Sequence, residues 1–313
     1  TRAKQRLFLT SSDDYGGKRT KKISQFVLEL LDDPTLGKIK HKQSPLEKIE
    51  KFKKIEGKLL KVRDASISKN GQLYLSRQQI DDYYTCPKKY YFVSVVKVPL
   101  PTDWHFMYGT AIHEALQRYF SKKQRGEKPD LDSLLTDFQI YFKNEGFITR
   151  NHEEQRYKTA IETLSRFYSE DQRTDLIPDM IEERFEFAED GLKINGRYDL
   201  VNKNKDGAEI LDFKTSEVKD QAEADRRIRE STQMKIYALA WYEKYNEIPQ
   251  TTLFFIESDK KGTRLFKEPD LEKTRQMIIE VAQGIKAEDY TAKPDSRKCK
   301  WCPYKFTCPD SAA

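Results

Sequence analysis

Three consecutive segments with strand character constrain the fold of this chain more than any other feature. Each is rich in β-branched and aromatic residues, and short polar turns with the hairpin pairs Asp190-Gly191 and Asp206-Gly207 separate them. The segments span residues 180–189, 192–203 and 208–216. We therefore expect three strands that follow one another in the chain and belong to one central sheet.

Helical periodicity surrounds these strands, because apolar residues recur at helical spacing on both sides of them. The segments with this spacing are 76–84, 108–124, 131–145, 152–171, 222–247 and 270–287. Two further strands are expected at 251–258 and 263–267. This order predicts an α/β fold, a central mixed sheet flanked by helices, with an added helical region.

Two of the strands carry an aspartate within an apolar run, Asp199 in "GRYDLV" and Asp212 in "ILDFKTS". A carboxylate in a half-buried strand costs free energy unless it is paired or bound to a cation. Asp212 and Lys214 share one strand face, and Phe213 points to the other. If the strands are neighbours, the two carboxylates converge on a site suited to Mg²⁺ or Mn²⁺. The alternative is a plain Asp–Lys salt bridge.

Two helices carry further candidate residues. His113 in "GTAIHEALQRYF" lies at the edge of an apolar stripe, where it is either structural or a metal ligand. Gln233 and Tyr237 in "QMKIYALAWY" lie one helical turn apart, so both could reach a phosphate or hold the lysine. Ordinary amphipathic packing explains the last pair equally well.

Together these residues resemble the RecB-like branch of the PD-(D/E)XK nuclease superfamily. The matching pieces, in order, are Gly109-x3-His113, Gly196-Arg197-x-Asp199-x-Val201, Asp212-x-Lys214-Thr215 and Gln233-x3-Tyr237. The resemblance implies a restriction-endonuclease-like core in which His113, Asp199 and Asp212 bind Mg²⁺ or Mn²⁺. The Phe213 carbonyl would complete the metal shell. Lys214 would assist the attacking water, and Gln233 and Tyr237 would contact DNA or support the site.

The four cysteines divide into one early and three late residues, Cys86 and then Cys299, Cys302 and Cys308. With no signal peptide and a C-x2-C pair, a metal site is favoured over disulfides, but spacing alone does not separate zinc from an iron–sulfur cluster. The chain is similar here to AddB-type nucleases and CRISPR-associated RecB-like exonucleases, which implies a [4Fe–4S] cluster in a four-cysteine clasp. Zn²⁺ is the alternative. The aromatic residues of this segment, Trp301, Tyr304 and Phe306, are expected to shield the metal from water.

The N-terminus resembles a different family. "TRAKQRLFLT" and "ISQFVLELL" look like the end of a UvrD/Rep-type superfamily 1 helicase, in which Arg2 would reach the ATP γ-phosphate of the parent protein. The other helicase motifs are missing, and the chain does not begin with Met, so we expect a fragment of a helicase–nuclease. The predicted division is a helicase remnant at 1–31, a Lys-rich linker at 32–72 and a nuclease domain at 73–313.

Charge and hydropathy limit the partners. Residues 1–70 hold 18 Lys and Arg against 9 Asp and Glu, whereas the remainder holds 39 against 42, so the body must bind DNA through a local groove. No apolar run is long enough to cross a membrane, and we expect a cytoplasmic protein. The expected partners are DNA, mainly single-stranded, and the missing helicase motor domains, with another subunit left open. The competing interpretations are a nuclease-fold scaffold that has lost catalysis and a zinc-stabilised interaction domain.

Overall fold

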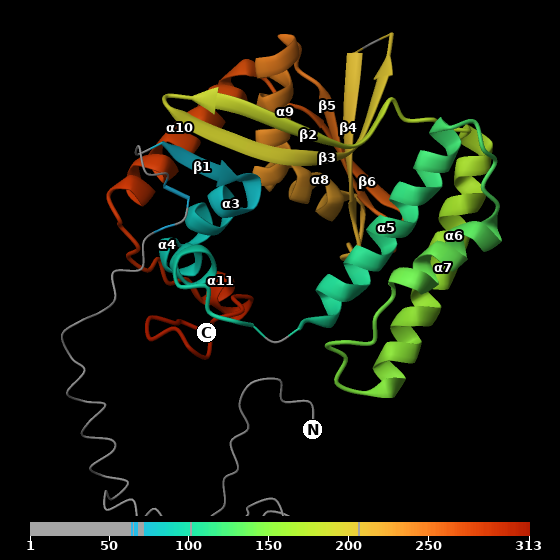
Figure 1. Cartoon of the computed structure of the whole chain (residues 1–313), viewed down its shortest axis with the longest axis horizontal. Coiled ribbons are helices and arrows are strands. Elements are labelled where there is room, and N and C mark those ends of the chain that lie inside the picture. Colours follow the sequence, from blue (N-terminus) through green and yellow to red (C-terminus); the bar gives the residue numbers. More distant parts are fainter. Residues whose placement is uncertain (1–63, 65, 68–71, 101, 206) are drawn as a thin grey trace, which may run out of the picture. The chain divides into compact units, whose positions relative to one another are not determined.

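The computed structural model describes residues 64, 66–67, 72–100, 102–205 and 207–313, which belong to one compact unit, Val62–Ala313 (Figure 1). The predicted helicase remnant at 1–31, with Arg2, and most of the predicted linker lie outside the described residues. Within the described part, no helix is long and apolar enough to cross a membrane.

A single mixed sheet forms the middle of this unit. Its strands are β1 Leu73–Ser76, β2 Met180–Glu189, β3 Leu192–Asn204, β4 Gly207–Lys214, β5 Gln250–Phe255 and β6 Lys260–Leu265. They run in the order β1-β3-β4-β5-β6, and β2 pairs with the other edge of β3. The three expected consecutive strands are therefore confirmed as β2, β3 and β4, and the turn between the first two uses left-handed φ angles of 42° at Asp190 and 73° at Gly191.

The long strand β3 is shared by two shorter partners. Its first part, 192–195, pairs in parallel with β1, and its last part, 200–204, pairs antiparallel with β4. Residues 196–199 lie between these two ladders. The sheet therefore forks at this point, and the residues on either side of the fork can face a common space.

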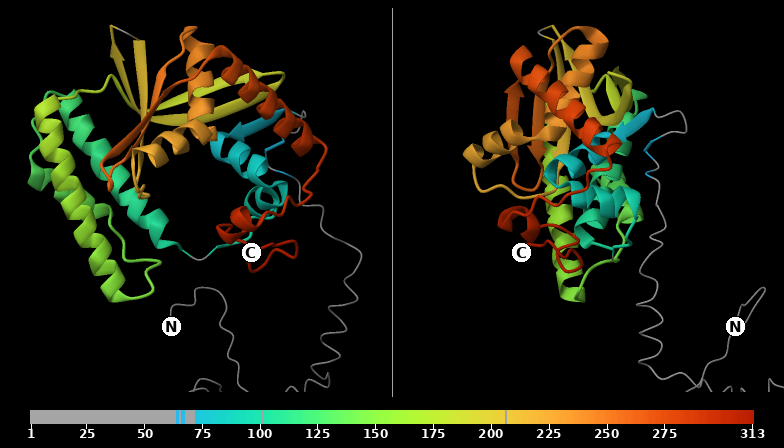
Figure 2. Two further views of the ribbon diagram at one scale, coloured as in Figure 1. Left: turned by 180° about the vertical axis from the view of Figure 1, so that it is seen from behind. Right: turned by 90° about the vertical axis from the view of Figure 1, so that its left-hand side faces the viewer.

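Helices cover both faces of the sheet (Figure 2). They are α3 Arg77–Thr85, α4 Pro87–Tyr90, the π-helix η1 Tyr91–Val95, α5 Trp104–Gln124, α6 Leu131–Tyr141, α7 Arg150–Thr174, α8 Gln221–Glu230, α9 Thr232–Tyr245, α10 Glu268–Lys286 and α11 Ser296–Lys300. The side chains of α3, α9 and α10 pack with Ile210 on one face. Those of α5, α6 and α7 pack with Leu211 on the other, as the period-two alternation of a strand requires.

One sequence expectation for the fold was wrong, and one strand was missed. The predicted helix 222–247 is two helices, because Ser231 is extended and its side chain accepts the N–H of Met234 as the N-cap of α9. The strand β1 was not expected, since four residues are too few to show periodicity. The extended Ser231 separates α8 from α9, and β1 brings the start of α3 beside β3.

Candidate active site

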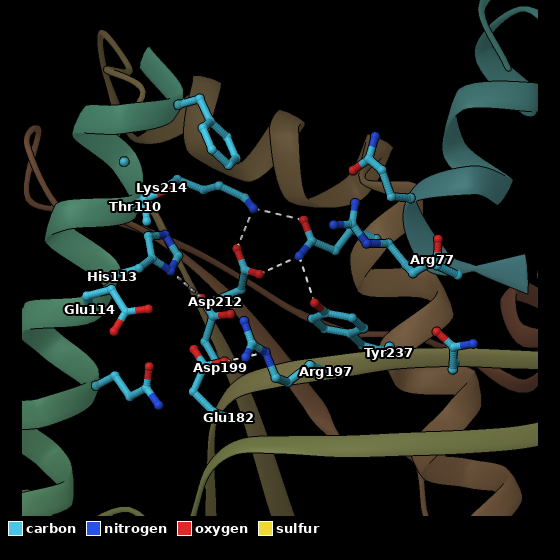
Figure 3. A pocket seen from close by; sticks show the side chains of 18 of the residues that line it. Arg77, Thr110, His113, Glu114, Glu182, Arg197, Asp199, Asp212, Lys214 and Tyr237 are labelled. Atoms are coloured by element: carbon cyan, nitrogen blue, oxygen red, sulfur yellow. Dashed lines mark hydrogen bonds and ion pairs between the residues drawn. The ribbon is translucent and has the colours of Figure 1, made fainter. Parts of the chain in front are cut away.

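A cleft of about 520 Å³ opens at the fork of the sheet. Side chains from α3, α5, β2, β3, β4 and α9 line it, and they include all six side chains that the sequence predicted for the site (Figure 3). These are His113, Asp199, Asp212, Lys214, Gln233 and Tyr237. Elements separated by more than a hundred residues therefore converge at one place.

The two aspartates meet because of the strand register. Leu200 pairs with Leu211, so Asp199 and Asp212 occupy the next opposing positions, where the ladder ends. Asp199 Oδ2 accepts the backbone N–H of Phe213 at 3.0 Å and thereby continues the ladder with a side chain. Asp212 is only 1% exposed. A buried carboxylate opposite a second carboxylate is unfavourable without a positive partner.

Lys214 supplies one positive partner. Its Nζ lies 2.5 Å from Asp212 Oδ2 and donates to Gln233 Oε1 at 2.8 Å. The amide nitrogen of Gln233 donates to the other oxygen of Asp212 and lies 2.9 Å from the hydroxyl of Tyr237. The expected Asp–Lys ion pair is thus present, but it is one part of a four-residue network that fixes the ammonium in the cleft.

His113 approaches the aspartates from α5. Its Nδ1 lies 3.3 Å from Asp199 Oδ2, and the ring also hydrogen-bonds to the backbone of Phe213. Gly109, one turn earlier, allows the helix to come this close, since a Cβ there would lie 3.3 Å from Thr215 Oγ1. The spacing Gly109-x3-His113 therefore has a packing reason as well as a chemical one.

Burial shifts the protonation equilibria of the cleft. It raises the pKa of Asp199 well above its usual range, and the charge of Asp212 adds to this. It lowers the pKa of His113, although the charge of Asp212 opposes the change. It also raises the pKa of Tyr237. The neutral imidazole is thus favoured, and it keeps a lone pair that can ligate a metal.

Two further residues of the cleft, Glu182 and Arg77, were not predicted for the site, whereas Arg197 belongs to one of the motifs quoted above. Glu182 of β2 pairs with Arg197, and burial raises the pKa of its carboxyl. Its φ of 52° interrupts an otherwise regular strand, which no sequence pattern indicates. Arg77 is the first residue of α3, and among the described residues no carboxylate or acceptor pairs with its guanidinium (Figure 3). The Ser76 capping box that starts this helix is the signal that could have located it.

The cleft fits a divalent cation. Asp212 Oδ2 and Glu182 Oε2 are buried and receive no hydrogen bond, so each has only its ion-pair partner. Carboxylate oxygens, a backbone carbonyl and an imidazole are the donors that Mg²⁺ and Mn²⁺ accept. Within the part of the chain that the structure describes, no three His, Cys, Asp or Glu side chains already converge closely enough to hold an ion. A bound cation would draw the carboxylates together, and its charge would offset the repulsion between them.

A second cavity, of about 220 Å³, is bordered by all four cysteines. Cys86 ends α3, Cys299 lies in α11, and Cys302 and Cys308 follow it, all as free thiols. Burial raises the pKa of the Cys302 thiol, and the nearby Cys86 and Cys299 contribute. The structure brings the early and the late cysteines to one place, but the described thiols do not converge on a point.

The expected aromatic shield of this cavity was partly wrong. Tyr304 is buried, with 3% of its surface exposed, and its hydroxyl donates to the Val98 carbonyl at 3.1 Å. Phe306 faces solvent at 90% exposure, and Trp301 borders the cavity but is itself 82% exposed.

Comparison with known proteins identifies the family. Residues 74–309 match the PD-(D/E)XK nuclease superfamily, a range that includes every residue of the cleft and all four cysteines. The chain belongs to this superfamily. The superfamily match begins at residue 74, so it does not bear on the predicted helicase remnant.

Individual relatives of this nuclease-superfamily chain include two phage proteins. It is 28% identical to the Gene 69 protein of Mycobacterium phage D29 over 267 residues, which cover 75% of this chain and 96% of the phage protein. The Gene 69 protein of Mycobacterium phage L5 is 24% identical, with 75% and 95% covered. Among crystal structures, a proposed exonuclease from Eubacterium rectale gives a TM-score of 0.45 at 13% identity, with 75% and 89% covered. The protein SSO0001 gives 0.32 at 16% identity, with 75% and 98% covered.

Proposed function

We propose that this chain is an Mg²⁺- or Mn²⁺-dependent deoxyribonuclease that acts as an exonuclease, mainly on single-stranded DNA. One observation carries the proposal: the fork between β3 and β4 places Asp199 opposite Asp212, with Lys214 beside them, in an open cleft. Membership of the PD-(D/E)XK superfamily supports the same reaction class. In metal-assisted hydrolysis of a phosphodiester, a cation activates a water and stabilises charge, and a cationic donor can assist, so this group of residues suits the reaction.

Each residue has a role that follows from its contacts. Asp199, Asp212, the Phe213 carbonyl and His113 would hold the cation. When bound, the cation lowers the pKa of a water molecule and offsets charge on the phosphate. Lys214, held between Asp212 and Gln233, donates to the attacking water or to a phosphate oxygen. Gln233 and Tyr237 keep the ammonium in that position.

Cleavage of an end-labelled single strand in Mn²⁺ tests this mechanism. Asp212→Ala and Lys214→Ala should each lower the rate by roughly 10²- to 10⁴-fold, in the range found for removal of a positioned acid, base or charge-stabilising group. Asp212→Asn, of nearly the same shape, separates loss of charge from loss of packing. Asp132→Ala, an exposed residue of α6, is the matched control. Undiminished cutting by the two alanine variants would refute this mechanism, whereas a wild-type protein that binds DNA without cutting it would be a DNA-binding scaffold.

We also propose that the cysteine cavity holds a [4Fe–4S] cluster that ties the beginning of the domain to its end. The support is geometric: four thiols border a cavity of about 220 Å³, whereas a zinc ion requires four sulfurs at about 2.3 Å from one point. An anaerobically purified protein should be brown, with stoichiometric iron and sulfide. A colourless protein that contains one zinc ion per chain would refute the cluster and support the zinc site instead.

The helicase context rests on the resemblance of residues 1–31 alone. We propose that the full-length protein couples unwinding to cleavage during DNA repair, with the motor delivering single strands to this domain. DNA-stimulated ATP hydrolysis by the full-length protein, lost on substitution of Arg2 by Ala, is the expected result. A full-length protein that cleaves DNA without any ATPase activity would refute the coupling but not the nuclease.

A further inference from the structure

The last fifteen residues carry an exposed surface that the catalytic cleft does not use. Trp301 and Phe306 are 82% and 90% exposed, which leaves two large rings in water on one short segment. Only Tyr304 between them is buried, and it anchors the segment through its ring contact with Phe92 at 5.2 Å. The two outer rings therefore contribute little to the fold, and another use explains them better.

Cationic side chains accompany both rings. Lys300 Nζ lies 5.7 Å from the centroid of Trp301, and Lys305 Nζ lies 5.1 Å from that of Phe306. Lys305 also donates to the Lys300 carbonyl at 3.2 Å, so the two ring-bearing stretches are held near each other. Four cations and no acidic residue lie between 296 and 306, the cations being Arg297, Lys298, Lys300 and Lys305. We call Trp301, Phe306, Lys300 and Lys305 the aromatic–lysine surface.

We propose that the aromatic–lysine surface binds single-stranded DNA, with bases stacked on Trp301 and Phe306 and phosphates beside Lys300 and Lys305. Aromatic rings combined with lysines accept any base and any backbone phosphate, which suits contact without sequence preference. The positive charge of the surface favours a polyanion such as DNA over a protein surface with few acidic residues. The proposal rests on the proposed function only in naming DNA as the nucleic acid, because the surface is distinct from the cleft residues.

Tryptophan fluorescence gives a direct test. The chain has three tryptophans, at 104, 241 and 301, and Trp241 is buried. Oligodeoxythymidylate of about 15 nucleotides is added in EDTA so that nothing is cut. It should quench the emission of Trp301, which is the part of the total emission that is missing in Trp301→Phe. Stacking magnitudes predict that Trp301→Ala and Phe306→Ala each weaken binding roughly 5- to 150-fold. Because both rings are exposed, neither substitution should unfold the domain.

The lysines have their own readout. Lys300→Gln with Lys305→Gln should reduce the slope of log affinity against log salt by about 1.4, at about 0.7 per phosphate contact on a single strand. Ile148→Ala and Lys128→Gln, both exposed and in loops elsewhere in the domain, are the matched controls. Cleavage of a dinucleotide, too short to reach the surface, should be unchanged in all these variants. If the affinity and salt slope of the variants and the Trp301 emission on adding DNA are all unaltered, the proposal is refuted even if the nuclease is active. Binding of a protein partner would then be the remaining explanation of the exposed rings.

Discussion

Binding of Mn²⁺ should stabilise the folded domain measurably, because the cation would relieve the repulsion between Asp199 and Asp212. At a hundredfold excess over the dissociation constant, a ligand that binds only the folded state contributes about 2.7 kcal/mol. The compact unit Val62–Ala313 has roughly 250 residues, so its unfolding entropy near the midpoint is about 0.5 kcal/mol/K. The expected rise in the unfolding temperature is therefore about 5 °C.

Calorimetry or circular dichroism of EDTA-treated protein, with and without Mn²⁺, measures this rise. Asp212→Asn should abolish most of it, since Asp212 is 1% exposed and opposes Asp199 at the end of the ladder. Asp132→Asn, on the exposed side of α6, should keep the full rise. An equal rise in Asp212→Asn would place the cation elsewhere and refute the assignment of the two aspartates as ligands.

Two further predictions concern individual residues of the cleft. Arg77→Gln should raise KM for DNA roughly 10- to 150-fold with little change in kcat. Arg77 lines the cleft, where we expect its guanidinium to bind a phosphate, and a charged hydrogen bond contributes about 1.5–3 kcal/mol. Steady-state kinetics beside the exposed control Arg229→Gln checks this, and a fall in kcat alone would contradict it. Burial raises the folded pKa of Asp199 above its unfolded value of about 3.9, so metal-free wild type should lose stability as pH rises through that folded pKa. Urea unfolding in EDTA at pH 5 and pH 8 should show a smaller loss for Asp199→Asn, and identical losses would mean that Asp199 is not the group responsible.

Much of the candidate site could be predicted because its chemistry lies in short motifs. Asp212 and Lys214 are two residues apart on one strand, and their sequence spacing already fixes that they share a face. Gln233 and Tyr237 are likewise related by one helical turn. The strand register that brings the motifs together could not be predicted from the sequence, because it depends on contacts between strands. The pairing of Leu200 with Leu211 decides whether Asp199 faces Asp212 at all.

The features that the sequence did not predict also depend on contacts between distant parts of the chain or on backbone geometry. Arg77 reaches the cleft only because β1 pairs with β3, a contact across more than a hundred residues. Glu182 joins it through a left-handed backbone angle inside a strand, which local sequence does not encode. The exposed rings of Trp301 and Phe306 were misjudged because hydrophobic character alone does not say which aromatic residue of a tight turn faces inward.

Helix α3 has a consequence for how defects in this protein are interpreted. Arg77 begins the helix at the catalytic cleft, and Cys86 follows its last residue at the cysteine cavity, so nine residues, about 14 Å of rigid backbone, separate the two sites. A movement of Cys86 would displace the guanidinium at the other end. If the cysteines hold the proposed metal, its loss would weaken the proposed binding of DNA by Arg77 although the residues of the cleft were intact. A loss of nuclease activity would not by itself reveal which end of the helix was damaged.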